Sequence, residues 1–126
     1  MNLLDSSGWL EFFVNGPRAH DFLPALGELD QLLVPTIVLY EVTKRVTLLR
    51  GANPVAEVVA TMRQGIVVDL DTPTALAAAH LSIAERLPMA DSIILATARR
   101  HSATIWTMDA DFEGKDGVRY FGRLTP

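Results

Sequence analysis

The sequence contains no cysteine and only three histidines, and these absences remove several kinds of catalytic and metal-binding site. Without cysteine the chain forms no disulfide, no thiolate zinc site and no thiol nucleophile. His20, His80 and His101 lie on separate segments without the spacing of a metal site. We therefore assign none of them a catalytic role and turn to the carboxylates.

Long apolar runs and an excess of basic charge are also missing. The longest charge-free stretch, Thr72 to Ala84, is shorter than the roughly 20 residues of a membrane-spanning helix. The first residues lack a basic region followed by an apolar one, so we expect a cytoplasmic protein without a membrane partner. The 11 basic and 15 acidic residues give a net charge of −4, opposite in sign to most nucleic-acid binders. Two bound divalent cations would cancel this charge, so RNA remains compatible as a partner.

The apolar residues are arranged as short strands alternating with helices. With 126 residues, 49% of them hydrophobic, we expect one domain spanning 1–126. Strands are predicted at 1–4, 32–34, 66–68, 103–107 and 118–121, and helices at 6–13, 17–29, 36–50, 53–63, 72–87 and 91–101. Residues 66–68 are all apolar, which is typical of a strand buried on both faces. The alternation predicts an α/β fold with a mostly parallel central sheet of about five strands and helices on both faces.

Four acidic residues occur where strands and helices meet. Asp5 closes the first strand, Asp109 follows the fourth, and Asp91 opens a helix. Glu41 interrupts the apolar run from Ile37 to Val42. Ligands of parallel sheets bind beyond the carboxyl ends of the strands, so we expect these carboxylates to meet at that edge.

Each acid also has an ordinary structural interpretation. Asp5 is a favoured helix cap, although Ser6 or Ser7 can cap the same helix. Asp91 suits the positive end of a helix dipole, and Asp109 and Asp111 suit a turn. Ser6 and Thr107 either orient ligands or are an ordinary cap and an ordinary strand threonine.

Glu41 is the hardest of the four to explain structurally, because its neighbours favour burial. An ion pair with Arg45, four residues along the helix, is worth only about 0.2 to 0.5 kcal/mol. A bound metal accounts better for a carboxylate at this position.

The chemistry of such a cluster follows from its charge. Two carboxylates about 6 Å apart repel each other by roughly 3 kcal/mol at an effective dielectric near 20, so the group favours a cation. Hard carboxylate oxygens select Mg²⁺ or Mn²⁺, which activate water and stabilise a leaving oxygen. The sequence therefore suggests a metal-dependent nuclease.

Four motifs occur in order along the chain: Leu4-Asp5-Ser6-Ser7, Pro35-Thr36 through Glu41, Ala90-Asp91, and Thr107-Met108-Asp109-Ala110-Asp111-Phe112. Together they resemble the PIN-domain ribonucleases, and the motif order and the chain length match the VapC-type toxins. The resemblance covers essentially the whole chain. It implies a PIN domain that cleaves RNA to 5′-phosphate and 3′-hydroxyl ends, with catalytic and metal-binding residues Asp5, Glu41, Asp91 and Asp109. It also implies a homodimer and a VapB-type antitoxin that wraps the early helices. Aromatic residues such as Trp9, Phe12 and Phe13 more often belong to a core than to an interface, but Trp9 or Phe13 could seat such an antitoxin.

Two other functions remain open at this stage. One is a catalytically silent PIN scaffold that acts only by binding. The other is a phosphate-switched receiver domain, because Ile66-Val67-Val68-Asp69 resembles a strand-terminal phosphoacceptor; the paired acids and the lysine that such a domain needs are missing. Basic residues on two helices either hold flanking phosphates or form solvated surface: Lys44, Arg45 and Arg50, and Arg99 and Arg100.

Overall fold

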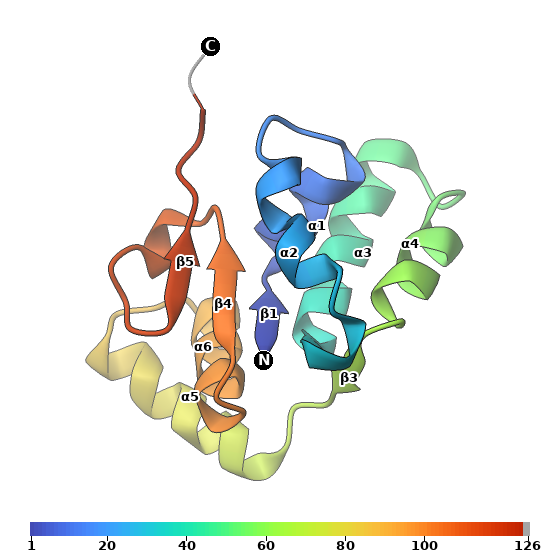
Figure 1. Ribbon diagram of the computed structural model, residues 1–126. Helices are drawn as coiled ribbons and strands as arrows, with labels where there is room; N and C mark the ends of the chain where they lie inside the picture. The colour runs from blue at the N-terminus through green and yellow to red at the C-terminus, as the bar shows by residue number, and fades with distance from the viewer. Residues whose placement is uncertain (125–126) are drawn as a thin grey trace.

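Five short strands form one fully parallel sheet in the computed structural model, which describes residues 1–124 (Figure 1). The strands are β1 (Asn2–Leu4), β2 (Leu32–Pro35), β3 (Ile66–Val68), β4 (Thr104–Thr107) and β5 (Val118–Tyr120). Their order across the sheet is β3-β2-β1-β4-β5, with β1 at the centre. The predicted α/β class and parallel sheet are confirmed.

Helices cover both faces of this sheet. Within residues 1–124 they are α1 (Ser6–Phe13), α2 (Leu23–Leu26), α3 (Thr36–Arg50), α4 (Val55–Met62), α5 (Thr72–Ala84) and α6 (Met89–Arg100), with 3₁₀ turns η1 (Ala19–Phe22), η2 (Leu29–Gln31) and η3 (Ala110–Phe112). In Figure 1, α2 lies in front of the sheet and α6 behind it. Among these helices, none is both long enough and apolar enough to cross a membrane.

The segment between β1 and β2 differs from its prediction. A single helix was expected from Pro17 to about Leu29, but the chain forms η1, α2 and η2 in succession. Pro24 lies in the first turn of α2, where its missing N–H prevents a helix from continuing through it. Gly27 then ends α2. Proline and glycine thus divide the expected helix into short pieces.

The predicted bounds of the long helices are close to those observed. The helix α3 spans 36–50 as expected and ends at Gly51, whose φ of 76° suits glycine. The helix α5 ends at Ala84, earlier than the expected Leu87, because Arg86 adopts a left-handed backbone with φ of 54°. The last strands of the sheet, β4 and β5, also match their predictions.

The strand β3 was expected at residues 66–68, but its predicted burial on both faces is wrong. Ile66 and Val67 are each 39% exposed. The strand lies at the edge of the sheet, where it pairs only with β2. An all-apolar run therefore identified a strand here without identifying a central one.

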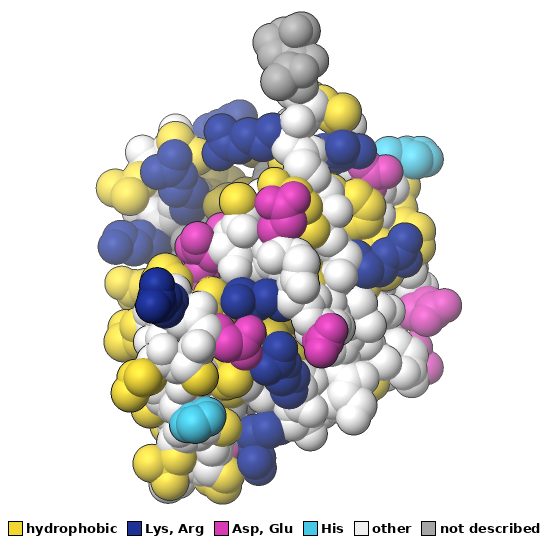
Figure 2. All heavy atoms as spheres, turned by 90° about the vertical axis from the view of Figure 1, so that its left-hand side faces the viewer, with side chains coloured by type: hydrophobic (Ala, Val, Ile, Leu, Met, Phe, Trp, Pro, Cys, Tyr) yellow, Lys and Arg dark blue, Asp and Glu magenta, His cyan; other side chains and the backbone are white. Residues whose placement is uncertain are grey.

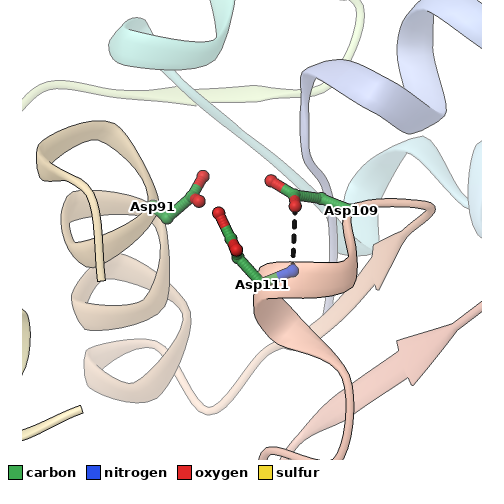
Figure 3. A group of neighbouring side chains, drawn as sticks. All are labelled: Asp91, Asp109 and Asp111. Atoms are coloured by element: carbon green, nitrogen blue, oxygen red, sulfur yellow. Dashed lines mark hydrogen bonds between the residues drawn. The ribbon is translucent and has the colours of Figure 1, made fainter. Parts of the chain in front are cut away.

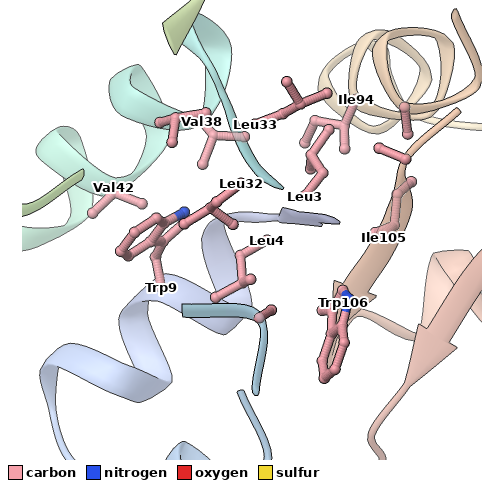
Figure 4. Close-up of a cluster of buried hydrophobic side chains, with 14 of the residues drawn as sticks. Leu3, Leu4, Trp9, Leu32, Leu33, Val38, Val42, Ile94, Ile105 and Trp106 are labelled. Atoms are coloured by element: carbon pink, nitrogen blue, oxygen red, sulfur yellow. The ribbon is translucent and has the colours of Figure 1, made fainter. Parts of the chain in front are cut away.

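The centre of the sheet carries the core (Figure 4). Leu3 and Leu4 of β1 are fully buried, as are Ile105 of β4 and Val34 of β2. Fully burying one such side chain stabilises a fold by about 1.5 to 3 kcal/mol. The carboxyl ends of β1 and β4, at Leu4 and Thr107, are consequently held in place by a well-packed core.

Candidate metal centre

The fold brings the four predicted acids to one edge of the sheet. Asp5 directly follows β1 and Asp109 follows β4, and these two strands are neighbours with Leu4 paired to Trp106. Asp91 lies in the first turn of α6, which packs on β4. Glu41 comes from α3, which contacts both β2 and α6.

Three carboxylates form the tightest group in the described part of the chain (Figure 3). Oxygens of Asp91, Asp109 and Asp111 all lie within 4.8 Å of one another. The carboxylate of Asp109 caps the 3₁₀ turn η3 by accepting a 2.9 Å hydrogen bond from the backbone N–H of Asp111. One short turn thus presents two of the three acids, and Asp111, which the sequence left open, belongs to the group.

Asp91 shows the electrostatic cost of this arrangement. It is only 9% exposed. Burial raises the pKa of Asp91 from its usual 3.8 to about 8, with further contributions from the negative charge of Asp109 and from a hydrogen bond to Asp111. Without a cation, one of these carboxyls therefore retains a proton near neutral pH.

Asp5 is the most deeply buried of the acids, at 2% exposure. Its Oδ1 accepts hydrogen bonds from Ser7 Oγ (2.7 Å) and Gly8 N (3.1 Å), so Asp5 itself caps α1 in place of the expected Ser6 or Ser7. Burial raises the pKa of Asp5 to about 6, although hydrogen bonds from Ser7, Thr107 and Gly8 oppose the rise. The two bonds to Oδ1 occupy both of its lone pairs, but among the residues that the structure describes Oδ2 accepts only one bond, from Thr107, and so keeps a lone pair for a cation.

Two hydroxyls join the ends of β1 and β4. Thr107 Oγ1 donates to Asp5 Oδ2 (2.6 Å) and accepts from the N–H of Asp109 (2.8 Å). Ser7 Oγ accepts from the N–H of Met108 (2.9 Å) while donating to Asp5. The sequence left the role of Thr107 open and did not single out Ser7. The signal that was available is a hydroxyl two residues from each strand-terminal aspartate.

Glu41 carries an unpaired buried atom. Its Oε1 is buried and has no hydrogen-bond partner. Burial raises the pKa of Glu41, a hydrogen bond from Ser6 lowers it in part, and the charge of Asp109 raises it again. An orphaned buried carboxylate oxygen beside other carboxylates fits a hard divalent cation, which takes oxygen ligands.

The segment that carries Asp109 and Asp111 is anchored at its far end. Lys115 Nζ and Arg99 Nη1 both bond to Glu85, at 3.2 and 2.8 Å. Partial burial acts to raise the pKa of Glu85, but its bonds to Lys115 and Arg99 outweigh this and lower it. These partly exposed ion pairs are each worth at most about 1 kcal/mol, so they steady the segment rather than hold the fold.

A hollow of about 940 Å³ opens beside the acids. We call it the acidic hollow; its walls come from α1, α3 and the segments after β4 and β5, and include Asp5, Ser7, Glu11, Arg45, Asp109 and Tyr120. Its volume lies in the range of small-molecule binding sites. Asp5 and Asp109 are both among its lining residues.

The family profile of the PIN domain matches residues 3–118. The chain belongs to the PIN-domain family. This confirms the resemblance seen in the four motifs, all of which fall within the matched residues. No curated protein sequence matches the chain significantly.

Solved structures share the fold of this PIN domain along nearly its whole length. A toxin-antitoxin complex from Klebsiella pneumoniae superposes with a TM-score of 0.83 at 21% identity, covering 98% of this chain and 100% of its own. VapC20 of Mycobacterium tuberculosis, a sarcin-ricin-loop-cleaving toxin, superposes with a TM-score of 0.79 at 13% identity, covering 94% of this chain and 97% of its own. DNA-bound VapBC from Salmonella typhimurium superposes with a TM-score of 0.75 at 18% identity, covering 97% of this chain and 98% of its own. At these identities the likeness establishes the fold.

The PIN fold also decides against the receiver interpretation. Asp69 follows β3, which is the edge strand, and its side chain is exposed. Two strands, β2 and β1, separate β3 from β4, whose end carries Asp109. Asp69 is therefore outside the group of acids at the centre of the sheet.

Proposed function

We propose that this PIN domain is a metal-dependent endoribonuclease and the VapC-type toxin of a toxin-antitoxin pair. The observation that carries the proposal is the convergence of acids on Asp109. Carboxylate oxygens of Asp91 and Asp111 lie within 4.8 Å of one of its own, and its charge adds to the burial that raises the pKa values of Asp5 and Glu41. Such a group of hard oxygen donors suits Mg²⁺ or Mn²⁺.

The proposed metal-binding and catalytic residues are Asp5, Glu41, Asp91 and Asp109, joined by Asp111. A divalent cation held there would lower the pKa of a bound water and offset negative charge on the scissile phosphate. The chain's own contribution is orientation: Thr107 and Ser7 fix both oxygens of Asp5, and the N–H of Asp111 fixes Asp109. Asp91 must release its proton before it can act as a ligand.

The partner we propose is a VapB-type antitoxin, since similar folds occur in toxin-antitoxin complexes. A second hollow of about 460 Å³ between α1, α3 and α4 fits the apolar side of such a protein, with Leu10, Phe12, Phe13, Val46, Leu49 and Val58 on its walls. We call this hollow the apolar groove, and Phe13 lines it. Trp9 lies in the core, 1% exposed, which agrees with the commoner of its two predicted roles and leaves Phe13 as the candidate for the interface. A homodimer in the cytoplasm completes the proposal.

The decisive experiment is cleavage of total RNA by the chain purified without a partner, with Mg²⁺, with Mn²⁺ or with chelator. We expect fragments with 5′-phosphate ends only when a divalent metal is present. Asp109→Asn should abolish them, whereas the matched change Asp69→Asn should not. Ribosomal RNA is the first substrate to examine, because VapC20 cleaves the sarcin-ricin loop. Cleavage unaffected by chelator, or none with either metal, would refute the assignment in favour of a silent scaffold.

The toxin role has a separate test. Expression of this chain alone should arrest growth, and co-expression of an antitoxin encoded beside it should restore growth. Asp109→Asn is the matched control, because it removes the proposed activity while leaving the apolar groove unchanged. Normal growth with abundant wild-type protein would contradict the toxin role without bearing on nuclease activity in vitro.

A further inference from the structure

A polyanionic substrate entering the acidic hollow meets mostly negative charge. Asp5, Glu11 and Asp109 line it, and Asp91 and Asp111 adjoin Asp109. Affinity of proteins for RNA comes mainly from Lys and Arg contacts to phosphates. The substrate therefore needs cations at the hollow itself, and the walls contain two, Arg45 of α3 and Arg123 beyond β5.

Several other basic side chains of the chain are already engaged. Arg18 pairs with Asp21, Arg99 and Lys115 pair with Glu85, and Arg119 lies over the ring of Trp106 at 4.3 Å. In contrast, neither Arg45 nor Arg123 has an ion-pair partner within residues 1–124. On the face drawn in Figure 2, acidic side chains near the upper edge have basic side chains on either side.

Arg123 is held near the hollow by the chain that precedes it. The N–H of Phe121 bonds to the carbonyl of Thr107 at 2.8 Å, which continues the sheet. Arg18 Nε then donates to the carbonyl of Gly122 at 2.9 Å. The backbone is thus fixed up to Gly122, the residue before Arg123. This segment follows β5, which lies beside β4, the strand that ends near Asp109.

Tyr120 supplies an aromatic ring in the same wall. It pairs with Thr107 across β4 and β5, and paired residues of parallel strands point to the same face of the sheet. Thr107 Oγ1 bonds to Asp5, so the tyrosine ring lies on the side of the sheet that carries this acid. Tyr120 lines the hollow and is only partly buried. Tyr120 thus shares the hollow with Arg45 and Arg123, and accessible aromatic rings are the side chains on which unstacked bases stack.

On the basis of the proposed function, we propose that Arg45, Tyr120 and Arg123 hold single-stranded RNA in the acidic hollow. The two arginines bind phosphates on either side of the scissile bond, and Tyr120 stacks on a base. Asp5 lines the hollow but is only 2% exposed, so an unstacked strand with splayed bases suits this wall better than a stacked duplex. These three residues determine substrate affinity, whereas the acids determine the rate of the chemical step.

The test is binding without cleavage. Fluorescence anisotropy is measured with a labelled single-stranded RNA of mixed sequence, and with its duplex, in chelator. Tyr120→Ala should weaken binding of the single strand about 5- to 150-fold, whereas Tyr120→Phe should nearly retain it. Arg45→Ala and Arg123→Ala should each lower the slope of log affinity against log salt by roughly 0.7. Lys44→Ala, which changes the neighbouring residue outside the hollow, is the control.

The outcomes separate this inference from the nuclease proposal. Variants that bind single-stranded RNA as wild type does, or a wild type that binds the duplex equally well, overturn the inference even if cleavage is observed. A wild type that fails to bind RNA overturns it as well. Selective loss of binding in the three variants supports it, even if no metal produces cleavage. Thermal melting of every variant checks that a loss of affinity is not a loss of folding.

Discussion

Asp5 and Asp69 are preceded by nearly the same sequence pattern but lie in opposite environments. Each directly follows a short apolar strand, β1 or β3. β1 is the central strand of the sheet, so Asp5 is 2% exposed and bonded to two hydroxyls, whereas β3 is an edge strand and Asp69 is exposed. The place of a strand in the sheet, which its own residues do not encode, decides whether the carboxylate at its end is suited to chemistry.

The largest expected contrast between the two strand ends is in catalysis. Asp109→Asn and Asp5→Asn should each lower single-turnover RNA cleavage by about 100- to 1,000-fold, because oriented charge at a reacting centre is worth that much. Binding of RNA should largely survive. Asp69→Asn should leave cleavage nearly unchanged. If Asp69→Asn abolished cleavage and Asp109→Asn retained it, the comparison would be reversed and the proposed site would be wrong.

A second contrast concerns pH. In the metal-free protein Asp5 and Asp91 have pKa values raised to about 6 and about 8. Both folded-state pKa values lie above the usual 3.8, so between about pH 4 and 8 the folded protein holds protons that the unfolded chain has released. Stability should therefore fall as pH rises, by several kcal/mol, on the order of 1.4 kcal/mol for each unit by which a pKa is raised. Urea unfolding in chelator across this range measures the slope.

Variants and metal make the pH prediction specific. Asp91→Asn should flatten the slope, stabilise the metal-free protein at pH 8 and remove the rise in melting temperature caused by Mg²⁺. Asp69→Asn should change none of these. A slope that persisted unchanged in Asp91→Asn would place the responsible protons elsewhere.

The hydroxyl network allows a finer comparison within one strand. Thr107→Val removes the donor to Asp5 Oδ2 and the acceptor of the Asp109 N–H, and should cost about 2 kcal/mol. Thr104, on the same strand, has no side-chain hydrogen bond in the described structure. Thr104→Val should therefore change stability by less than about 0.5 kcal/mol. Equal losses in the two variants, measured by denaturant unfolding, would show that the network contributes nothing to stability.

The smallest expected effect lies on the edge strand. Val34 and Val67 are paired across β2 and β3, with Val34 fully buried and Val67 39% exposed. Val34→Thr should cost about 1 to 2 kcal/mol because it buries a hydroxyl. Val67→Thr should change stability by no more than about 0.5 kcal/mol, since threonine suits an exposed strand. A similar loss at both positions would mean that β3 is covered in solution.

Much of the arrangement could be predicted from local patterns. The strands follow from short apolar runs. The helix α3 follows from a stretch without proline or glycine that begins after Pro35 and ends before Gly51. The four acids were found because each stands where an element begins or ends, or where burial is expected. These are signals that neighbouring residues carry.

What could not be predicted depends on contacts between distant residues. The exposure of Ile66 and Val67 follows from strand order, which no local pattern reveals. Asp111 differs from an ordinary turn residue only because α6 brings Asp91 to it. The role of Ser7 requires β1 and β4 to be neighbours. The break in the helix expected between Pro17 and Leu29 is different, because Pro24 and Gly27 are local signals in the sequence that mark it.

The pairing of β1 with β4 has a consequence for how the protein is made. Asn2 lies beside Thr104, so the first strand emerges from the ribosome long before its neighbour on one side has been synthesised. Until then Asp5 has no Thr107 to orient it and no Asp109 beside it. A nascent chain can therefore pair β1 with β2 and begin a core while its acids remain apart. On the function proposed above, the ability to cut RNA is therefore acquired only after β4 and the acids that follow it have been synthesised.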